Sequence, residues 1–348
     1  MSWEKTLDSY GAAIEENLRI FFAEAVEEAE HYHTLIAKVY CDLEEIVLRK
    51  GGRLASCSTL LTYLGYMGTV DPKILKVCVG IELYRHSILV HDDLVDMDNL
   101  RRGGSTLHKK FIESHDTRFG EGIAVFAGNI AYALATRAII ESGFPEQKIA
   151  KLLLLFSEGY AEVNESQILD LLFEYKDVDV NEWRIMASKR AASLFRITML
   201  AGAMLGGAPE KDLLILGEAA ENMGYSFDIQ DDIIDTFARE DQYGRPPCGD
   251  ISMGKKPLHI ICALNSADQR ESEALKMLLR KRSLSRNDIE LVRTVIRENG
   301  GLEAAKNTSR KHAEQARALI DQTTLRNDIK AFFKGLTAYI EESLDWYK

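Results

Sequence analysis

The 348-residue sequence has few cysteines, few prolines and no excess of positive charge. Its cysteines are odd in number and scattered, without a C-x-x-C pair. They are typical of small buried side chains in a reducing cytosol. The net charge of −11 argues against the basic face that a nucleic acid requires, so we expect no nucleic-acid partner. The five cysteines are Cys41, Cys57, Cys78, Cys248 and Cys262.

The sequence also lacks the pattern of a signal peptide, because its first residues, MSWEKTLDSY, are charged from the fourth position onward. By inspection, no apolar run approaches the ~18–20 residues of a membrane-spanning helix. The most apolar stretch, KLLLLFSEGY at 151–160, is too short. We therefore expect no transmembrane segment and a cytoplasmic location.

Only six prolines occur, at Pro72, Pro145, Pro209, Pro246, Pro247 and Pro257. The first three stand where helices are expected to begin, and the last three mark one irregular stretch at roughly 240–257. Apolar residues recur at spacings of three and four, as in Leu152, Leu155 and Phe156, and no alternating run is long enough for a sheet. The sequence predicts one all-α domain over residues 1–348, with a central helical bundle.

Two stretches crowd carboxylates at the spacing of a helical turn, DDLVD at 92–96 and DDIID at 231–235. On a helix, Asp92 and Asp96 lie on one face. Asp231 and Asp235 share a face in the same way. Carboxylates so close repel one another unless a cation lies between them, and oxygen ligands completed by water or phosphate suit Mg²⁺. A solvated acidic surface is the alternative, but each stretch lies within an otherwise apolar run, which favours a binding site.

Positive side chains follow both stretches: Arg101 and Arg102 follow the first, and Arg245, Lys255 and Lys256 follow the second. Arginine binds phosphate through paired N–H groups, and lysine supplies a compact charge. Two facing acidic walls with Mg²⁺ between them and basic residues at the rim predict a diphosphate site. An ordinary surface charge pair is the alternative for the two arginines.

From about residue 45 to 260 the sequence resembles the trans-isoprenyl diphosphate synthases, the polyprenyl synthetase family that includes farnesyl and geranylgeranyl diphosphate synthases. DDLVDMDNLRRGGSTLH resembles the family's first aspartate-rich motif, and DDIID resembles the second. SQILDL, KRAASLF and GDISMGKK stand where the family has Q-x-x-D-L, K-T-x-x-L and G-x-D-x-x-x-G-K. Several motifs in the right order make the resemblance stronger than any single motif does.

The resemblance implies an all-α isoprenoid-synthase fold, a homodimer, and condensation of an allylic prenyl diphosphate with isopentenyl diphosphate. It also implies three Mg²⁺ ions per active site, held by Asp92, Asp96 and Asp231. Asp93 and Asp235 would complete the metal site from a greater distance.

For the substrates, the resemblance implies that Arg101, Lys189 and Lys255 hold the allylic diphosphate. Gln167 would lie with the same substrate, and Arg102 would hold the homoallylic one. In the family the departed pyrophosphate takes the final proton, so no side-chain base is expected. The implied catalytic set is Asp92, Arg101, Lys189 and Asp231.

The acceptor motif departs from the family pattern. The family has G-G-K-R-x-R-P, whereas this chain has GGRLAS at 51–56. Alignment on Arg53 places Gly52 at the lysine and Ala55 at the second arginine. Each charge-assisted contact with phosphate is worth ~1.5–3 kcal/mol, so losing two of them weakens acceptor binding unless other residues compensate.

Three cations remain for the acceptor: Arg53, Arg102 and Arg85, which replaces a histidine seven residues before Asp92. Lys50 and Arg85 are the candidates for compensation. A different acceptor is the alternative.

The allylic side departs at two positions. Arg190 replaces a threonine, and Asp228 replaces a glutamine. Both positions flank the same substrate in the family, so the two residues either pair with each other or have changed independently.

Product length is set in the family by residues before the first aspartate motif. Ser87, five residues before Asp92, is too small to stop a growing chain, whereas Tyr84, eight before, is bulky enough. Each helical turn advances ~5.4 Å, about one isoprene unit, so the sequence predicts a C20 to C25 product. The alternative is that Tyr84 faces away from the growing chain, in which case longer products are possible.

Three other functions are weighed against chain elongation. Prenyl transfer to a different acceptor would explain the altered acceptor motif. A class I terpene cyclase is disfavoured, because the second stretch is an intact DDxxD. A non-catalytic regulatory subunit is disfavoured by the complete set of aspartates.

Overall fold

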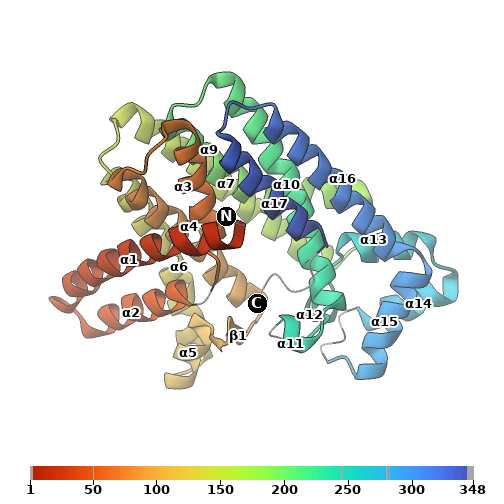
Figure 1. Ribbon diagram of the computed structural model, residues 1–348. Helices are drawn as coiled ribbons and strands as arrows, with labels where there is room; N and C mark the ends of the chain where they lie inside the picture. The colour runs from red at the N-terminus through yellow and green to blue at the C-terminus, as the bar shows by residue number, and fades with distance from the viewer. Residues whose placement is uncertain (1–2, 50, 244–245, 280, 282, 343–348) are drawn as a thin grey trace. The chain divides into compact units, whose positions relative to one another are not determined.

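The computed structural model describes residues 3–49, 51–243, 246–279, 281 and 283–342 of the chain (Figure 1). Within these ranges the regular structure is helical, apart from two strands of two residues each. The prediction of an all-α fold is therefore confirmed.

The chain divides into two compact units, which we call the first and the second unit. The first consists of residues 1–156 and 198–213, and the second of residues 157–197 and 214–348. The single domain over 1–348 stays a prediction. The division falls inside three helices, α7 (Glu146–Phe173), α9 (Ala191–Gly206) and α10 (Glu210–Phe237).

The first unit begins with two neighbouring helices, α1 and α2, that run side by side in opposite directions (Figure 1). The elements that lie wholly in this unit are α1 (Trp3–Glu30), α2 (Thr34–Leu48), α3 (Leu54–Met67), α4 (Pro72–Val95), β1 (Leu100–Arg101), β2 (Gly104–Ser105), α5 (Leu107–Ser114) and α6 (Thr117–Ile140).

Helix α4 is the core helix of the first unit, because residues 77–84 are buried without a break and it packs against α1, α3 and α6. Two glycines allow a close approach to α6. A Cβ on Gly80 would lie 2.9 Å from the carbonyl oxygen of Ala135, and a Cβ on Gly128 would lie 2.2 Å from Nε2 of His91. The close packing fixes the end of α4 that carries the first acidic stretch.

Helix starts follow the prolines as the sequence predicts. Asp71 caps α4 by accepting a hydrogen bond from the Lys73 amide (Oδ1···N 2.8 Å), and Pro72 is the first helical residue. Helices α7 and α10 begin directly after Pro145 and Pro209.

Strands β1 and β2 form an antiparallel ribbon in which Leu100 lies opposite Ser105. They are joined by Arg102 and Gly103, whose φ angles of 51° and 77° match the type I′ turn of a tight hairpin. Arg49 of α2 donates to the carbonyl oxygens of Arg101 (3.0 Å) and Ser105 (2.8 Å) and so holds both strands. Strands of two residues are too short to show alternation, which is why the sequence did not predict this ribbon.

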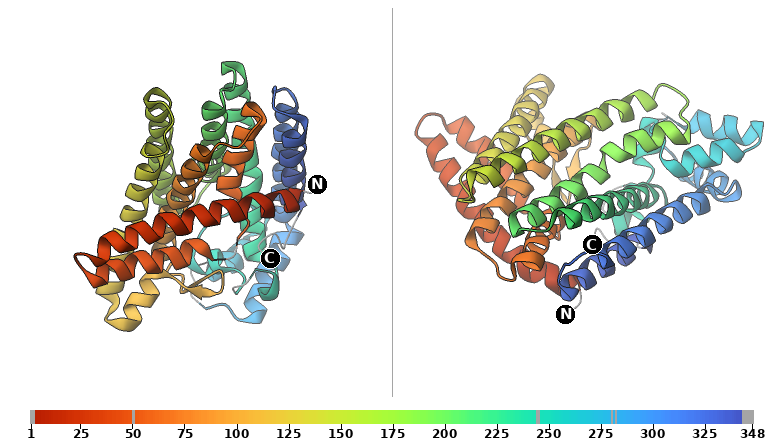
Figure 2. Two further views of the ribbon diagram at one scale, coloured as in Figure 1. Left: turned by 60° about the vertical axis from the view of Figure 1, so that its left-hand side comes forward. Right: turned by 90° about the horizontal axis from the view of Figure 1, so that it is seen from above.

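The second unit ends in two long helices, α16 and α17, which lie side by side (blue in Figure 2). The stretch near 240–257 that the sequence predicted as irregular contains two short helices, α11 and α12. The elements wholly in this unit are α8 (Val180–Lys189), α11 (Glu240–Tyr243), α12 (Gly249–Met253), α13 (Leu258–Ser266), α14 (Gln269–Leu278), α15 (Arg286–Glu298), α16 (Gly301–Asp321) and α17 (Asn327–Glu342).

A buried aromatic anchors the packing of α10 in the second unit. Trp183 of α8 lies in one hydrophobic cluster with Ile229 and Ile233 of α10 and with Leu258 and Ile261 of α13. One face of α10 therefore packs in the hydrophobic core. This packing fixes the direction in which the acidic residues of the same helix point.

Helix α6 is long and apolar enough to cross a membrane, judged by length and composition alone. The expectation that no such stretch exists is wrong by this criterion. Close to half of its most apolar stretch is buried, and the helix packs against α4 and α5. Core helices of globular proteins pass the same test, so this single helix is weak support for a membrane span.

Candidate active site

The first acidic stretch lies at the C-terminal end of α4. Asp92 and Asp93 belong to the last turn, and Asp96 ends the helix with its amide donating to the Asp92 carbonyl oxygen (2.8 Å). The C-terminus of a helix carries a partial negative charge, so carboxylates there are unfavourable unless cations accompany them. The location alone therefore favours a cation-binding role.

Arg101 of β1 is one such cation. Its Nη2 lies 3.2 Å from Oδ2 of Asp92, and its Nε donates to Oδ1 of Asp93. Burial raises the pKa of Asp93 to about 7, although the charge of Arg101 opposes this rise. The structure thus joins Arg101 to the first acidic stretch, as the sequence predicted, and Arg101 is not a mere surface charge.

Arg102 lies beside other arginines. A Cβ on Gly51 would approach its Cζ to 2.8 Å, so its guanidinium lies against the bare backbone of Gly51. Although much of Arg102 is exposed, partial withdrawal from water and then the charge of Arg85 lower its pKa to about 10. Positive charge is therefore concentrated here, which favours the binding of an anion.

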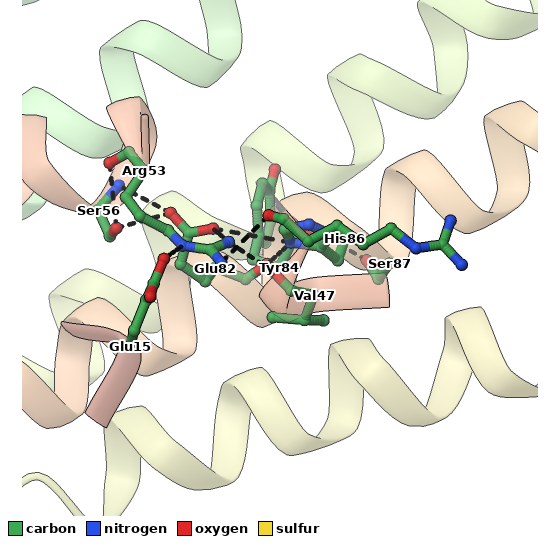
Figure 3. A network of polar contacts seen from close by, with 9 residues as sticks. Glu15, Val47, Arg53, Ser56, Glu82, Tyr84, His86 and Ser87 are labelled. Atoms are coloured by element: carbon green, nitrogen blue, oxygen red, sulfur yellow. Dashed lines mark hydrogen bonds and ion pairs between the residues drawn. The ribbon is translucent and has the colours of Figure 1, made fainter. Parts of the chain in front are cut away.

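Arg53, predicted to bind the acceptor, is buried in a polar network (Figure 3). Its Nε lies 3.1 Å from Oε1 of Glu15, and its Nη1 lies 3.5 Å from Oε2 of Glu82 and donates to the carbonyl oxygen of Val47. The Ser56 hydroxyl donates to the other Glu82 oxygen at 2.6 Å. Arg53 therefore links α1, α2, α3 and α4 within the first unit.

Glu82 and His86 form the α4 side of this network (Figure 3). Burial opposes the charge of Glu82, but neighbouring positive charges, including Arg53, and the Ser56 hydroxyl keep its pKa below the usual value. Burial lowers the pKa of His86 to about 3, so its ring is neutral, and Nδ1–H donates to the Glu82 carbonyl oxygen (2.8 Å). The sequence analysis missed Glu82, although its spacing of four from His86 was visible.

The two residues predicted to set product length lie on α4, deep in the first unit. Tyr84 is fully buried, and its ring packs against Phe156 (centroids 4.8 Å apart) and Tyr132 (6.2 Å). The Ser87 hydroxyl donates to the Tyr84 carbonyl oxygen (2.8 Å) and adds no bulk. Tyr84 therefore faces an aromatic cluster, and not solvent.

The second acidic stretch lies in the last turns of α10, again at the negative end of a helix. Asp231 is half-buried, whereas Asp232 and Asp235 are buried. Oδ2 of Asp235 accepts a hydrogen bond from the Asp250 amide (3.3 Å), and its carbonyl oxygen accepts one from the Cys248 amide (2.7 Å). Asp235 is thereby tied to the start of α12.

Arg190 enters the second acidic stretch from the end of α8. Its Nε and Nη2 lie 2.7 and 2.9 Å from the two oxygens of Asp228, and Nη2 lies 3.5 Å from Oδ1 of Asp232. Burial works against its charge, but Asp228 and Asp232 raise the pKa of Arg190 well above its usual range. Of the two alternatives that the sequence left open, pairing or independent change, the structure shows the pair of Arg190 and Asp228, in bidentate geometry.

The remaining predicted cations of the second unit differ in their surroundings. Lys255 lies 3.3 Å from Oδ2 of Asp170, which belongs to the same motif as the half-buried Gln167. Lys189 pairs with Glu165 of α7 (Nζ···Oε2 2.5 Å), on a more exposed part of the surface. The structure therefore brings Lys255, but not Lys189, into contact with the carboxylates that surround Arg190.

Lys256, Lys50 and Arg245 complete the set of cations named from the sequence. Lys256 is buried and donates to the backbone carbonyl oxygens of Phe173 and Gly254, so it ties the end of α7 to the chain beside α12. Lys50 and Arg245 lie outside the described residues.

Within the described ranges, no three His, Cys, Asp or Glu side chains stand close enough to hold one metal ion. The chemistry of the donors nevertheless suits Mg²⁺, which prefers carboxylate oxygens. Oδ2 of Asp232 is buried without a hydrogen-bond partner in the described part of the chain, and burial raises the pKa of this residue well above its usual value. Such an oxygen fits a cation.

The sequence is similar to known proteins over most of its length. It matches the family model named Polyprenyl synthetase over residues 38–296. The geranylgeranyl diphosphate synthase of Sulfolobus acidocaldarius is 30% identical over 253 residues, which cover 72% of this chain and 74% of that protein. The geranylfarnesyl diphosphate synthase of Aeropyrum pernix is 28% identical over 303 residues, covering 85% and 92%.

Solved structures share the fold. The geranylgeranyl pyrophosphate synthetase of Pyrococcus horikoshii Ot3 matches with a TM-score of 0.85 at 24% identity over 98% of both chains. A geranylgeranyl pyrophosphate synthase from Corynebacterium glutamicum matches with a TM-score of 0.91 at 20% identity, over 98% of this chain and 99% of that one.

The helical fold, the two acidic stretches and these matches define the class as an enzyme of isoprenoid biosynthesis that transfers prenyl groups. The chain belongs to the polyprenyl synthetase family. The resemblance predicted from the motifs is confirmed.

Proposed function

We propose that the protein condenses an allylic prenyl diphosphate with isopentenyl diphosphate, head to tail, in a Mg²⁺-dependent reaction. The observation that carries this proposal is that both acidic stretches stand beside cations suited to phosphate. Arg101 contacts the first stretch, and Arg190 contacts the second. The names of the relatives, geranylgeranyl and geranylfarnesyl diphosphate synthases, support the reaction class.

Asp92, Asp96 and Asp231 would hold Mg²⁺, with Asp93 and Asp235 completing the site. When bound, Mg²⁺ would neutralise the charge that develops on the leaving diphosphate. A solved structure of the same fold is described as a complex with isoprenyl diphosphate and magnesium, which supports this choice of metal. A count of three ions per active site is part of the proposal.

The positively charged side chains would bind the allylic diphosphate and stabilise its departure. As the C1–O bond breaks, the electron pair leaves with the diphosphate, and Arg101, Lys189 and Lys255 compensate the new charge. The double bond of the acceptor then attacks the allylic cation, and the departed pyrophosphate takes the proton that the product releases. Lys189 would exchange Glu165 for the diphosphate, and Gln167 would position the same substrate.

The acceptor diphosphate would be bound chiefly by Arg85 and Arg102, where positive charge is concentrated. Arg53 supports this site through its bonds to Glu15 and Glu82. A different acceptor is the second candidate, because the altered motif offers no further cation. The two positions where the family has its lysine and second arginine are closely packed: a Cβ on Gly52 would lie 2.6 Å from Cδ2 of Leu7, and Ala55 is buried.

An elongation assay tests the proposed function. The purified protein is incubated with farnesyl diphosphate and isopentenyl diphosphate, in Mg²⁺ or in EDTA, and the dephosphorylated products are separated by chromatography. We expect longer prenols in Mg²⁺ and none in EDTA. Equal product in EDTA would contradict the metal dependence, and no product with any allylic substrate would contradict the elongation.

We propose a C20 to C25 product, limited by Tyr84. The Tyr84→Ala variant should make products at least one five-carbon unit longer, because the ring lies ~12 Å along α4 from Asp92 and Ser87 offers no obstruction between them. Chromatography of the dephosphorylated products measures the length. Tyr63→Ala is the matched control, because Tyr63 is equally buried in the first unit and packs against Phe144 instead. A product distribution that is the same in all three proteins would show that Tyr84 is not the limit.

We also propose a homodimer that uses the outer face of α6. Val125, Phe126 and Ile140 of this helix are exposed, and 66% of Phe126 is accessible. Phe126→Arg should weaken dimerisation at least a hundredfold, about 2.8 kcal/mol, because it buries a charge in an apolar contact. Sedimentation velocity gives the oligomeric state, with the equally exposed Tyr32→Arg as control. A variant that dimerises as tightly as the wild type would exclude this face.

A cytoplasmic location is proposed as well. All five cysteines are free thiols in the structure, which agrees with a reducing compartment.

A further inference from the structure

Arg190 stands among three acidic side chains of the second unit. It binds Asp228 through two hydrogen bonds of 2.7 and 2.9 Å, and it lies 3.5 Å from Asp232 and 3.8 Å from Asp170. The three carboxylates come from two helices, α7 and α10, and a single guanidinium bridges them. We call these four residues the Arg190 cluster.

The carboxylates of the Arg190 cluster cannot be stable as free charges. Asp170, Asp228 and Asp232 are each at least nine-tenths buried, and two of them lie near the negative end of α10. Lys255 lies 3.3 Å from Asp170 and compensates its negative charge. Within the described residues, Asp228 and Asp232 form their ion pairs with Arg190. A cation is therefore required at this place, and the protein supplies one from its own chain.

The charge of the Arg190 cluster is only partly satisfied. Arg190 contacts Oδ1 of Asp232, whereas Oδ2 is buried and has no hydrogen-bond partner in the described part of the chain. A guanidinium is planar, and that of Arg190 directs its N–H groups toward Asp228, Oδ1 of Asp232 and Asp170, which leaves the second oxygen of Asp232 able to accept another cation. The Arg190 cluster is thus arranged to hold Arg190 as a fixed internal cation and to bind a further cation at Oδ2 of Asp232.

We infer that Arg190 takes the place of a further divalent cation in the second acidic stretch, in addition to the three ions proposed above, and that the carboxylates there would hold this ion if Arg190 were absent. The inference rests on the proposed Mg²⁺-dependent function and concerns the part that Arg190 plays in it. Arg190 positions Asp228 and Asp232 before any metal binds.

The test compares Mn²⁺ binding in the wild type, Arg190→Thr and Arg190→Gln, because Mn²⁺ is a paramagnetic substitute for Mg²⁺. The intensity of the electron paramagnetic resonance signal of free Mn²⁺, with inorganic pyrophosphate present, gives the number of ions bound per chain. Arg196→Thr is the matched control. Arg196 lies on the neighbouring helix α9 and, like Arg190, bridges carboxylates, those of Glu162 and Glu221. Thermal unfolding in EDTA and in Mg²⁺ is the second measurement.

Both Arg190 variants should bind one additional Mn²⁺ per chain, and Asp228→Asn added to Arg190→Thr should remove it again. In EDTA the single variants should unfold at a lower temperature than the wild type, and Mg²⁺ should restore most of the loss. Arg196→Thr should gain no ion, and Mg²⁺ should not restore its stability.

Equal Mn²⁺ binding in the wild type and in the two Arg190 variants, with a loss of stability that Mg²⁺ does not restore, would overturn the inference and leave Arg190 as a structural ion pair. That result would leave the proposed function intact. No Mn²⁺ binding by any of the proteins would overturn both the inference and the proposed metal dependence.

Discussion

Asp92→Ala and Asp231→Ala should each lower kcat by at least about a thousandfold, about 4 kcal/mol, while the helical fold is retained. Each substitution removes a carboxylate that would hold Mg²⁺ against the leaving diphosphate. Both aspartates are only partly buried, and they lie near the ends of α4 and α10, so their loss leaves no cavity in the core. Steady-state elongation rates and circular dichroism of the purified variants provide the measurements.

Matched controls come from aspartates close in sequence that have no assigned role in the reaction. Asp98→Ala makes the same chemical change just after the first stretch. Asp241→Ala does so after the second, where Asp241 is exposed and paired with Arg239. Both controls should keep activity within a factor of about three of the wild type. Near-normal activity in Asp92→Ala or Asp231→Ala would refute the metal assignment.

Glu82→Ala should lower the free energy of unfolding by about 3–5 kcal/mol, since it removes the buried carboxylate partner of Arg53 and leaves the buried guanidinium to the partly exposed Glu15. Glu82 and Arg53 are 1% and 4% exposed, and the Ser56 hydroxyl also loses its acceptor. Urea or guanidinium denaturation, followed by circular dichroism, measures the change.

The control for this variant is Glu15→Ala, which removes the other carboxylate that pairs with the same arginine. The Glu15 side chain is 36% exposed, so water can replace it, and the expected cost is about 1 kcal/mol or less. The double variant Glu82→Leu/Arg53→Met should recover more than half of the loss, because no buried charge then remains. Equal losses for Glu82→Ala and Glu15→Ala would show that the burial of the pair is unimportant.

The sequence predicts the parts of this protein that depend on short-range patterns. The helical periodicity and the prolines at 72, 145 and 209 predict the all-α fold and three helix starts, and the structure confirms them. The two acidic stretches were found because a spacing of four places carboxylates on one helical face. For Arg190 and Asp228 the sequence left two alternatives, pairing or independent change, because both positions depart from the family pattern together, and the structure shows the pair.

Contacts between distant helices are what the sequence did not predict. Glu82 lies in an apolar stretch, and a period of four relates it to His86 but not to Arg53, which is 29 residues away on another element. Alignment therefore assigned Arg53 to the substrate, whereas the structure engages it with Glu15 and Glu82. The hydrogen bonds from Arg49 to the ribbon of β1 and β2 were missed for the same reason.

The most direct test of the account is a single-turnover measurement with labelled farnesyl diphosphate and labelled isopentenyl diphosphate. It compares the pyrophosphate released with the isopentenyl label that enters the product. The account predicts that the two amounts are equal, that both require Mg²⁺, and that little pyrophosphate forms without isopentenyl diphosphate. Pyrophosphate released at full rate without incorporation of isopentenyl diphosphate would contradict chain elongation and would indicate cyclisation or a different acceptor.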